Sequence, residues 1–341
     1  MSDLFEKLLI LRTPRIGPAR YNDLVKKFGS VSAAAATLNV PGELRDAVAR
    51  EMERAAALGI NYVCDTDDAY PRALRAVKNH PPVITVRGNI DALRRPAVAM
   101  VGTRHSTATG MMFLADLAQE FAARGFVVVS GLAMGTDAAA HRGALRAPGD
   151  AQTVAVVAGG VDYVWPPENE SLYHEIVARG AVISEMPVGF VPVASNFIMR
   201  NRWVAGMSDR LILGEADLNS GSMATARFAI EYGRDVWAIP SHPADSRAVG
   251  PNSLIATGAA RLCAGVSDFF ADTAATPSAK IKKSDDGENN DSLLDKLGTI
   301  PMSETVLTQV VKKDISEIKR ELVILEMRGL VRKTDGGYVR V

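Results

Sequence analysis

Six short apolar runs, separated by stretches of helical pattern, constrain the fold of this chain more than any other feature. The runs cover residues 97–102, 126–131, 153–160, 181–186, 210–216 and 235–240. Strands that are apolar throughout, alternating with amphipathic helices, are typical of a parallel sheet that helices cover on both faces. In residues 111–125, for example, Leu114, Leu117 and Phe121 share one helical face and Gly125 can end the helix. We therefore expect a doubly wound, mostly parallel Rossmann-like α/β sheet, which the strand-like segments 60–63 and 81–88 extend.

The segments on either side of this sheet have different patterns. Residues 1–60 are helical in pattern, with a turn at Gly17-Pro18, and predict an N-terminal helical domain of the helix-hairpin-helix or SAM-like kind. Such a hairpin can present backbone amides to a phosphate or serve only for packing. Residues 271–292 are small, polar and charged and predict a flexible linker between the Rossmann-like domain at 61–270 and a compact segment at 293–341. In that last segment, helices precede two strands around Asp335-Gly336-Gly337, which predicts a winged-helix domain.

Charge, cysteine content and hydropathy exclude several classes of protein. Cys64 and Cys263 lie far apart and form neither a disulfide framework nor a zinc spacing, which is typical of a reducing cytosol. Asp3 and Glu6 near the start make a poor signal peptide, and no apolar run reaches the length of a membrane span. We therefore expect a soluble cytoplasmic protein. The formal net charge of +0 does not exclude a nucleic-acid partner, because binding depends on where the charges lie.

The loops that follow the apolar runs carry the functional signal. Ligands of an open parallel sheet bind beyond the carboxyl ends of its strands. The loops read GTRHSTATG (102–110), SGLAMGTDAAAH (130–141), GGVDYVWPPEN (159–169), FIMRNRWVAG (197–206) and LNSGSMATA (218–226). Glycine and small hydroxyl residues at helix starts suit anions, since free amides and the helix dipole favour negative charge. Together with Arg104, Arg200 and Arg202, these loops predict a site for several phosphates. Three explanations of the arginines remain open: a pocket for a small phosphorylated substrate, a groove for a nucleic-acid backbone, and a structural ion pair.

Motifs for cofactor or catalytic chemistry are weak. The first loop lacks the spacing of a dinucleotide-binding fingerprint, and the sequence contains no P-loop. Asp137 and His141 stand four residues apart and could act as orienter and base for Ser130, but capping and packing explain them better. The strand-end acids have no spacing that selects a pair, and the five histidines form no metal-binding cluster. We expect no cofactor, no metal and no catalytic residues.

Taken in order, the loop motifs resemble the DprA/Smf family, the DNA-processing proteins of bacteria. The resemblance rests on VGTRHST, SGLAMGTDAAAHRGAL, VAVVAGGVDYVWPPEN, ISEMPVG, FIMRNRWVAG, EADLNSGSMATARFAIEYGRDVWAIP and NSLIATGA, and it extends to both flanking segments. It implies an extended Rossmann fold, a homodimer and a non-enzymatic role. That role is to bind single-stranded DNA and to help load the RecA recombinase during natural transformation and DNA recombination.

The resemblance also implies the residues that line the DNA groove. They are Gly102, Thr103, Arg104, Ser106, Gly131, Gly135, Phe197, Arg200, Asn201, Arg202, Ser220, Gly221, Ser222 and Thr225. Single strands are held by a basic groove and by planar side chains on which bases stack, which suits the arginines and Phe197. We expect Trp203 in the core. The sequence departs from the family pattern at three places, Ile198, Ala194 and Pro240-Ser241. These departures bear on the expected affinity for DNA more than on membership of the family.

Two further questions stay open. The winged helix offers Lys312, Lys313, Lys319 and Arg320 to duplex DNA, but Asp314, Glu317 and Glu321 lie among them, so a protein contact is equally consistent. The rival function is a nucleotide-phosphate hydrolase of the LOG type. The absence of the signature P-G-G-x-G-T-x-x-E counts against it, although Glu231 follows SGSMATARFAIE on the same expected helix. A purely structural adaptor fits the strand-end loops least well.

Overall fold

The computed structural model describes residues 2–150, 152–271, 293–298, 301–311, 313–334 and 336–340. Contacts divide the chain into two compact units, Met1–Ala275 and Thr276–Val341. Apart from Ala271, the segment expected to be a linker lies outside the described residues. The division into four parts stays a prediction.

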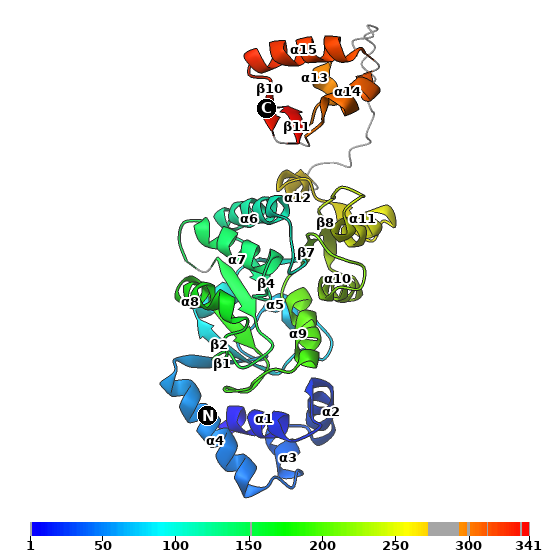
Figure 1. Ribbon diagram of the computed structural model, residues 1–341. Coiled ribbons are helices and arrows are strands. Elements are labelled where there is room, and N and C mark those ends of the chain that lie inside the picture. The colour runs from blue at the N-terminus through cyan, green and yellow to red at the C-terminus, as the bar shows by residue number, and fades with distance from the viewer. Residues whose placement is uncertain are drawn as a thin grey trace. The chain divides into compact units, whose positions relative to one another are not determined.

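Four helices precede the sheet and lie together beside its first two strands (Figure 1). They are α1 (Ser2–Arg12), α2 (Pro18–Phe28), α3 (Val31–Ala36) and α4 (Gly42–Ala57). The turn expected at Gly17-Pro18 is present, because Gly17 is the N-cap of α2 and Pro18 stands in its first turn, where a missing amide hydrogen costs nothing. Ile10 and Tyr21 form the small core between α1, α2 and α3.

Nine strands form a single sheet in the order β1-β2-β6-β5-β4-β3-β7-β8-β9. They are β1 (Ile60–Cys64), β2 (Val83–Gly88), β3 (Ala97–Val101), β4 (Val127–Ser130), β5 (Thr153–Val156), β6 (Ala181–Ser184), β7 (Arg210–Leu213), β8 (Asp235–Ala238) and β9 (Arg261–Leu262). The pairs β1–β2 and β2–β6 are antiparallel and all other neighbours are parallel. The expected doubly wound, mostly parallel sheet is confirmed.

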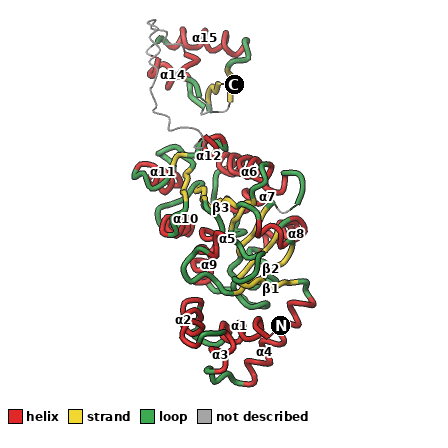
Figure 2. The backbone as a smooth tube through the Cα atoms, turned by 180° about the vertical axis from the view of Figure 1, so that it is seen from behind, coloured by secondary structure: helices red, strands yellow, loops and turns green. Residues whose placement is uncertain are grey.

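Helices that connect or follow the strands cover both faces of the sheet (Figures 1 and 2). They are α5 (Arg72–Arg75), α6 (Ala108–Ala123), α7 (Thr136–Arg146), α8 (Glu170–Arg179), α9 (Ala194–Gly206), α10 (Gly221–Glu231), α11 (Val249–Ala256) and α12 (Ser267–Ala271). Short 3₁₀ turns are η1 (Ile90–Arg94), η2 (Pro167–Asn169) and η3 (Ser246–Ala248).

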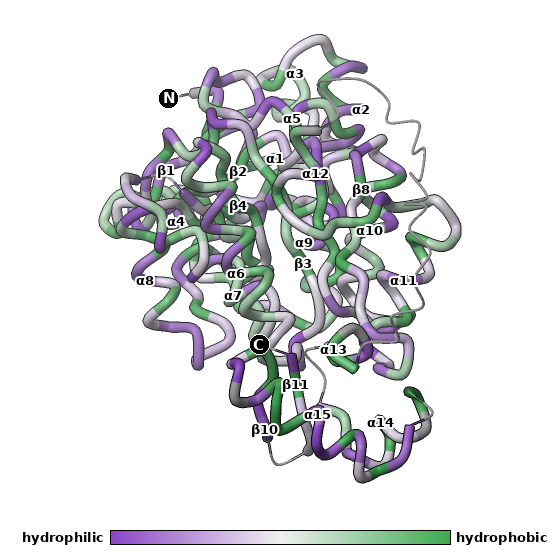
Figure 3. Tube along the Cα trace, turned by 90° about the horizontal axis from the view of Figure 1, so that it is seen from above, coloured by the Kyte–Doolittle hydropathy of each residue, from purple (hydrophilic) through white to green (hydrophobic). Residues whose placement is uncertain are grey.

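The central strand β3 shows why the apolar runs are continuous. Val98 and Met100 pack in a core with α6 and α7, whereas Ala99 and Val101 pack in another core with α9 and α10. Successive side chains of a strand point to opposite faces, so a strand covered on both sides has no polar position to alternate with. The tube coloured by hydropathy accordingly runs apolar through the central strands (Figure 3). The face predicted for α6 is also confirmed, since Leu114, Leu117 and Phe121 are buried.

The second unit has its own core. It contains α13 (Leu293–Lys296), α14 (Glu304–Val311), α15 (Ile315–Met327), β10 (Val331–Thr334) and β11 (Gly337–Arg340), the last two paired antiparallel. The apolar spacing of Ile315, Ile318, Leu322 and Leu325 predicts one buried stripe on α15. The last three are buried, whereas Ile315 is exposed, which corrects that member of the prediction. The helices and the hairpin are present, and their identity as a winged helix stays a prediction.

Candidate nucleic-acid interface

The winding of the sheet reverses next to β3. The chain passes from β3 through β4 and β5 to β6 and then returns to the other side of β3 as β7. The connections after β3 and β7 therefore leave in opposite directions and open a crevice at the carboxyl ends of the strands. A cavity of about 500 Å³ occupies this position. We call it the switch-point pocket.

Most of the residues predicted for the site line the switch-point pocket. They are Gly102, Thr103, Arg104, Gly131, Phe197, Arg200, Asn201, Ser220, Gly221, Ser222 and Thr225. Three loops that lie far apart in the sequence thus meet α9 at one crevice, as the order of the strands requires. The pocket does not include Ser106, Gly135 or Arg202 among its lining residues.

Arg200 lines the pocket as a buried side chain and not as an exposed, mobile one. Its side chain is buried at 7% exposure. The guanidinium Nη1 donates to the backbone carbonyls of Gly131 and Val156, and Nε donates to Asn201 Oδ1 at 3.2 Å. Burial lowers the pKa of Arg200 to about 10, and the neighbouring Asp137 opposes that shift. The group therefore stays charged at neutral pH and adds a fixed positive charge beneath the pocket.

Asp137 lies beside this arginine and holds the loop after β4. Its Oδ2 accepts hydrogen bonds from the amides of Gly131 at 3.2 Å and Ala133 at 3.3 Å. Burial raises the pKa of the Asp137 carboxyl, while the Arg200 charge and the two amides lower it, and burial prevails. Asp137 is thus a loop anchor that also lines the pocket, a position that the motif alone did not reveal.

His141 does not pair with Asp137. Its Nδ1 lies 2.6 Å from Thr153 Oγ1, and burial lowers the pKa of the ring to about 3, so the imidazole is neutral. Ser130 donates to the Met100 carbonyl at 2.6 Å. The Ser130 hydroxyl also lowers the pKa of Asp137, but His141 bonds to Thr153 instead of either residue, so the three side chains do not form a connected nucleophile, base and orienter.

Gly135 and Gly131 are required by close approach. Gly135 has φ of +72°, and a Cβ there would lie 2.5 Å from the Arg104 carbonyl oxygen. The start of α7 is therefore pressed against the loop that carries Arg104. A Cβ on Gly131 would lie 2.6 Å from the Arg200 guanidinium. Both glycines position the loops, and Gly135 does so from outside the pocket.

The hydroxyl residues of the loops are mostly tied within the fold. Ser106 Oγ donates to the Thr103 carbonyl at 3.2 Å and lies 2.5 Å from Thr136 Oγ1. Ser220 caps α10 by accepting from the Met223 amide at 3.3 Å, and its hydroxyl lies 2.9 Å from that of Ser222. These contacts leave the amides at the start of α10 at the edge of the pocket, where an anion can reach them.

Arg104 is the exposed cation of the pocket. It lies on the loop after β3 and has no hydrogen-bond or ion-pair partner among the described residues. Its guanidinium can therefore contact a phosphate without breaking an internal bond, and an arginine can grip a phosphate through two donors at once.

Two aromatic side chains stand at the mouth of the pocket. Phe197 was predicted as a stacking residue, and Trp165 of the loop after β5 lies 6.5 Å from it, ring centre to ring centre, at 60°. Trp165 is 45% exposed although it is large and apolar. It also lines a smaller adjoining cavity of about 240 Å³ together with Arg104, Met134 and Phe197. The sequence signal that could have found it is an aromatic residue in a strand-end loop.

The structure does not bring Arg202 to the switch-point pocket. Its Nη2 lies 3.3 Å from Glu185 Oε2, and its guanidinium stacks over Trp203 at 4.0 Å from the ring centre. Trp203 itself is buried, as expected. The grouping of all three arginines in one groove is therefore wrong in geometry, since Arg202 lines a different cavity on the opposite side of α9.

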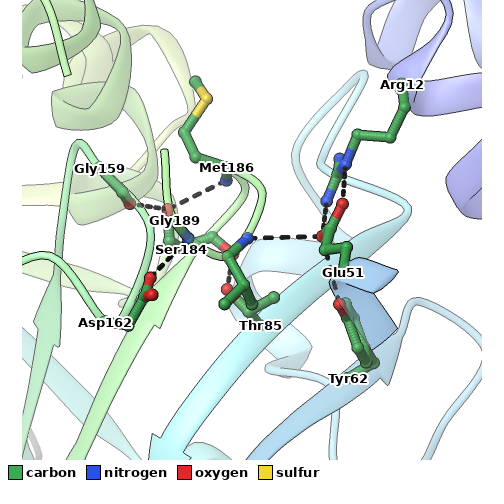
Figure 4. Close-up of polar contacts among 10 residues, drawn as sticks. Arg12, Glu51, Tyr62, Thr85, Gly159, Asp162, Ser184, Met186 and Gly189 are labelled. Atoms are coloured by element: carbon green, nitrogen blue, oxygen red, sulfur yellow. Dashed lines mark hydrogen bonds and ion pairs between the residues drawn. The ribbon is translucent and has the colours of Figure 1, made fainter. Parts of the chain in front are cut away.

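Two further strand-end acids, Glu215 and Asp162, have individual partners. Glu215 accepts from the Thr107 amide at 2.7 Å and thereby caps α6. Asp162 accepts from the Gly189 amide at 2.7 Å and pairs with Arg54, as Figure 4 shows in part. These contacts describe acids that hold loops in place.

Known proteins resemble this chain over most of its length. Residues 61–274 match the family described as DNA recombination-mediator protein A, and residues 2–58 match the DprA-like N-terminal HHH domain. Protein Smf of Synechocystis sp. is 39% identical over 202 residues, a match that covers 58% of this chain and half (50%) of that relative. DNA processing protein A of Streptococcus pneumoniae superposes with a TM-score of 0.67 at 28% identity, covering 78% of this chain and 97% of the other. DNA processing protein A of Helicobacter pylori, whose structure was described for its single-stranded DNA binding mode, superposes with a TM-score of 0.56 at 31% identity over 62% of this chain and 93% of the other.

Proposed function

This chain belongs to the DNA recombination-mediator protein A family, and from that premise we propose that it binds single-stranded DNA in the switch-point pocket. We further propose that the bound strand is handed to the RecA recombinase, as the resemblance to DprA/Smf proteins implies for natural transformation and recombination. The protein would act as a homodimer and without a cofactor.

One observation carries the proposal for single-stranded DNA. The switch-point pocket combines the unpaired Arg104, the buried charge of Arg200 and the aromatic pair Trp165 and Phe197 at one crevice. Phosphates contact the cation and the amides at the helix starts, while an unstacked base can lie against an aromatic ring. A duplex offers no free base face to such a ring, so a single strand is the better ligand.

A salt titration of oligonucleotide binding tests the site. We expect tight binding to single strands, weaker binding to duplex, and a log K that falls with log salt by about 0.7 for each phosphate contacted. Arg104→Ala should lower the affinity and make this slope shallower by about 0.7. Arg142→Ala, which removes an exposed arginine of α7 outside the pocket, is the matched control and should leave the slope unchanged. An unaltered slope for Arg104→Ala would refute the site.

The recombinase step needs a separate assay. We expect the protein to accelerate the assembly of RecA filaments on strands that are already coated with single-strand binding protein. Arg104→Ala should reduce this acceleration in proportion to its loss of affinity. A wild-type protein that binds the strand but gives no acceleration at any ratio would refute the loading role and leave the binding role intact.

The hydrolase alternative makes an opposite prediction. A phosphoribohydrolase would release free base from a nucleoside monophosphate, whereas the proposed function involves no covalent step. The carboxylates near the pocket support the binding role, because Asp137 and Glu215 both accept hydrogen bonds from loop amides. Chromatographic detection of free base with wild-type protein, abolished by Asp137→Asn, would revive the enzyme.

In the second unit, two of the lysines expected to contact duplex DNA are paired with acids. Lys313 Nζ lies 2.9 Å from Glu321 Oε2, and Lys319 Nζ lies 3.4 Å from Glu304 Oε2. Lys312 lies outside the described residues. Because two of the candidate cations are paired with acids of the same unit, their net positive field is small. We therefore propose contact with duplex DNA only as a weak, salt-sensitive addition.

A further inference from the structure

A second cavity lies on the other side of α9, between that helix and the N-terminal hairpin. Its volume is about 860 Å³. In the ribbon of Figure 1 and in the tube of Figure 2, α9 and α2 are near one another on the same side of the sheet. The connection between α1 and α2 forms one wall and α9 with the loop after β6 forms the other. We call this cavity the hairpin groove.

The charge of the hairpin groove is positive. Arg15 and Arg20 line it, are exposed, and have no hydrogen-bond or ion-pair partner among the described residues. Arg202 lines it as well but pairs with Glu185, the one acid among the described lining residues. Two exposed arginines without internal partners, facing a cavity, are available to an anionic ligand in the way that Arg104 is.

Hydrogen bonds and ion pairs hold the hairpin against the sheet. Arg12 donates to both carboxylate oxygens of Glu51 at 2.8 and 2.9 Å, and Glu51 accepts from the Val188 amide at 3.4 Å (Figure 4). Asn22 Nδ2 donates to Asn79 Oδ1 at 3.4 Å from the other side. These contacts link the N-terminal helices to the segments that form the rest of the groove.

Two exposed residues of α9 that are neighbours in sequence each line one of the two cavities, and we call them the crest of α9. Ile198 lines the switch-point pocket and its neighbour Met199 lines the hairpin groove. Both are exposed, at 57% and 43%, although both are large and apolar. Their exposed apolar side chains offer a surface on α9 against which a base can pack.

We propose that the hairpin groove is a second subsite for the same single strand, in which Arg15 and Arg20 contact phosphates beyond the switch-point pocket. This inference rests on the proposed function. It makes the N-terminal domain part of the DNA path and extends the length of strand that one protomer covers.

The test compares a short oligonucleotide of about 5 nucleotides, near the lower end of the range that single-strand sites cover, with a long one of about 30 nucleotides, well beyond its upper end. Arg15→Ala/Arg20→Ala should make the salt slope shallower by about 1.4 on the long strand, since each lost phosphate contact removes about 0.7, and should leave the short strand unaffected. The matched control is Arg45→Ala/Arg50→Ala, which removes two exposed arginines of α4 that lie outside the groove.

A second variant examines the crest without removing a cation. Met199→Glu places a carboxylate at the edge of the groove on an exposed position and should weaken only the long strand. The inference is overturned if both variants bind the long strand with the wild-type slope while Arg104→Ala still lowers affinity. It is also overturned if the hairpin variants bind DNA normally but lose RecA loading, because the groove would then take an acidic protein partner. Failure of the wild-type protein to bind either oligonucleotide would instead refute the proposed function.

Discussion

Arg200→Ala is expected to lower the free energy of unfolding of the first unit by about 3 kcal/mol. The structure places the Arg200 guanidinium against the carbonyls of Gly131 and Val156, and the substitution removes the donor from both. A buried acceptor left without a partner costs about 1–3 kcal/mol, and removing one member of a buried charged pair costs about 3–5 kcal/mol. Water entering from the switch-point pocket can hydrate the Gly131 carbonyl, which keeps the loss near the lower end of these ranges.

The loss should also depend on pH, through Asp137. Burial already raises the pKa of this carboxyl, and the Arg200 charge opposes that rise. Removing the arginine therefore raises the pKa of Asp137 further. A carboxyl whose folded pKa lies above its unfolded value of about 3.9 favours the protonated folded state, so its contribution to stability is lost as pH rises through the folded pKa. The variant should lose more stability at pH about 8 than at pH about 5.

Urea unfolding followed by tryptophan fluorescence provides the assay. Trp165, Trp203 and Trp237 all belong to the first unit, so the signal does not include the second. The double variant Arg200→Ala/Asp137→Asn serves as the control, because it removes the uncompensated carboxyl and should show no added pH dependence. An unfolding free energy within about 0.5 kcal/mol of wild type, or an equal loss at both pH values, would refute the assignment of Arg200 as a buried cation.

Three further predictions concern the pocket. Trp165→Ala and Phe197→Ala should each cost about 1–3 kcal/mol of single-strand affinity with little change in salt slope, measured by fluorescence anisotropy, because stacking rather than charge is lost. Gly135→Ala should lower both stability and affinity, measured by thermal unfolding and oligonucleotide binding, because its φ of +72° and the 2.5 Å approach to the Arg104 carbonyl leave no room for a Cβ; wild-type values would contradict this. Ala194→Lys, at an exposed position of the pocket, should strengthen binding and steepen the slope by about 0.7, and a weaker complex would contradict the path of the phosphates.

Much of the sheet could be predicted from the sequence because its central strands are buried on both faces. The runs at 97–102 and 126–131 contain the observed strands Ala97–Val101 and Val127–Ser130. For the first two strands, the sequence does not predict whether they run parallel or antiparallel to their neighbours. Nothing local in Ile60–Cys64 or Val83–Gly88 determines that they pair antiparallel, because that choice depends on how α4 and α5 return the chain to the sheet.

The different positions of Arg200 and Arg202 follow from helix geometry. Residues of an α-helix are about 100° apart around its axis, so Arg200 and Arg202 are about 200° apart and cannot face the same groove. The resemblance to the DprA/Smf family implies both arginines as DNA-binding residues, and whether both contact DNA stays a prediction. In the structure Phe197 and Asn201 accompany Arg200, whereas Asn196 and Met199 accompany Arg202. The helical positions of Arg200 and Arg202 therefore place them in two different cavities.

The burial of Arg200 and the position of Trp165 beside Phe197 could not be predicted from helix geometry. Whether an arginine is buried depends on carbonyls of Gly131 and Val156, which are distant in sequence and meet it only when the sheet forms. Trp165 belongs to a loop more than thirty residues before Phe197, and no periodicity links the two. Contacts between loops of different strands are set by strand order, which the sequence indicates only in outline.

The electrostatics of the pocket explain how a chain without net charge can hold a polyanion. The buried Arg200 has the carboxyl of Asp137 beside it, and each group shifts the pKa of the other. Arg104 is then the one exposed cation among the described residues that line the pocket. Binding of a short strand should therefore depend on amides and stacking more than on ion pairs, and its salt slope should be near the value of about 0.7 for a single contact. The phosphate contacts that a longer strand needs must come from outside the pocket, and Arg15 and Arg20 of the hairpin groove are exposed cations just across the crest of α9.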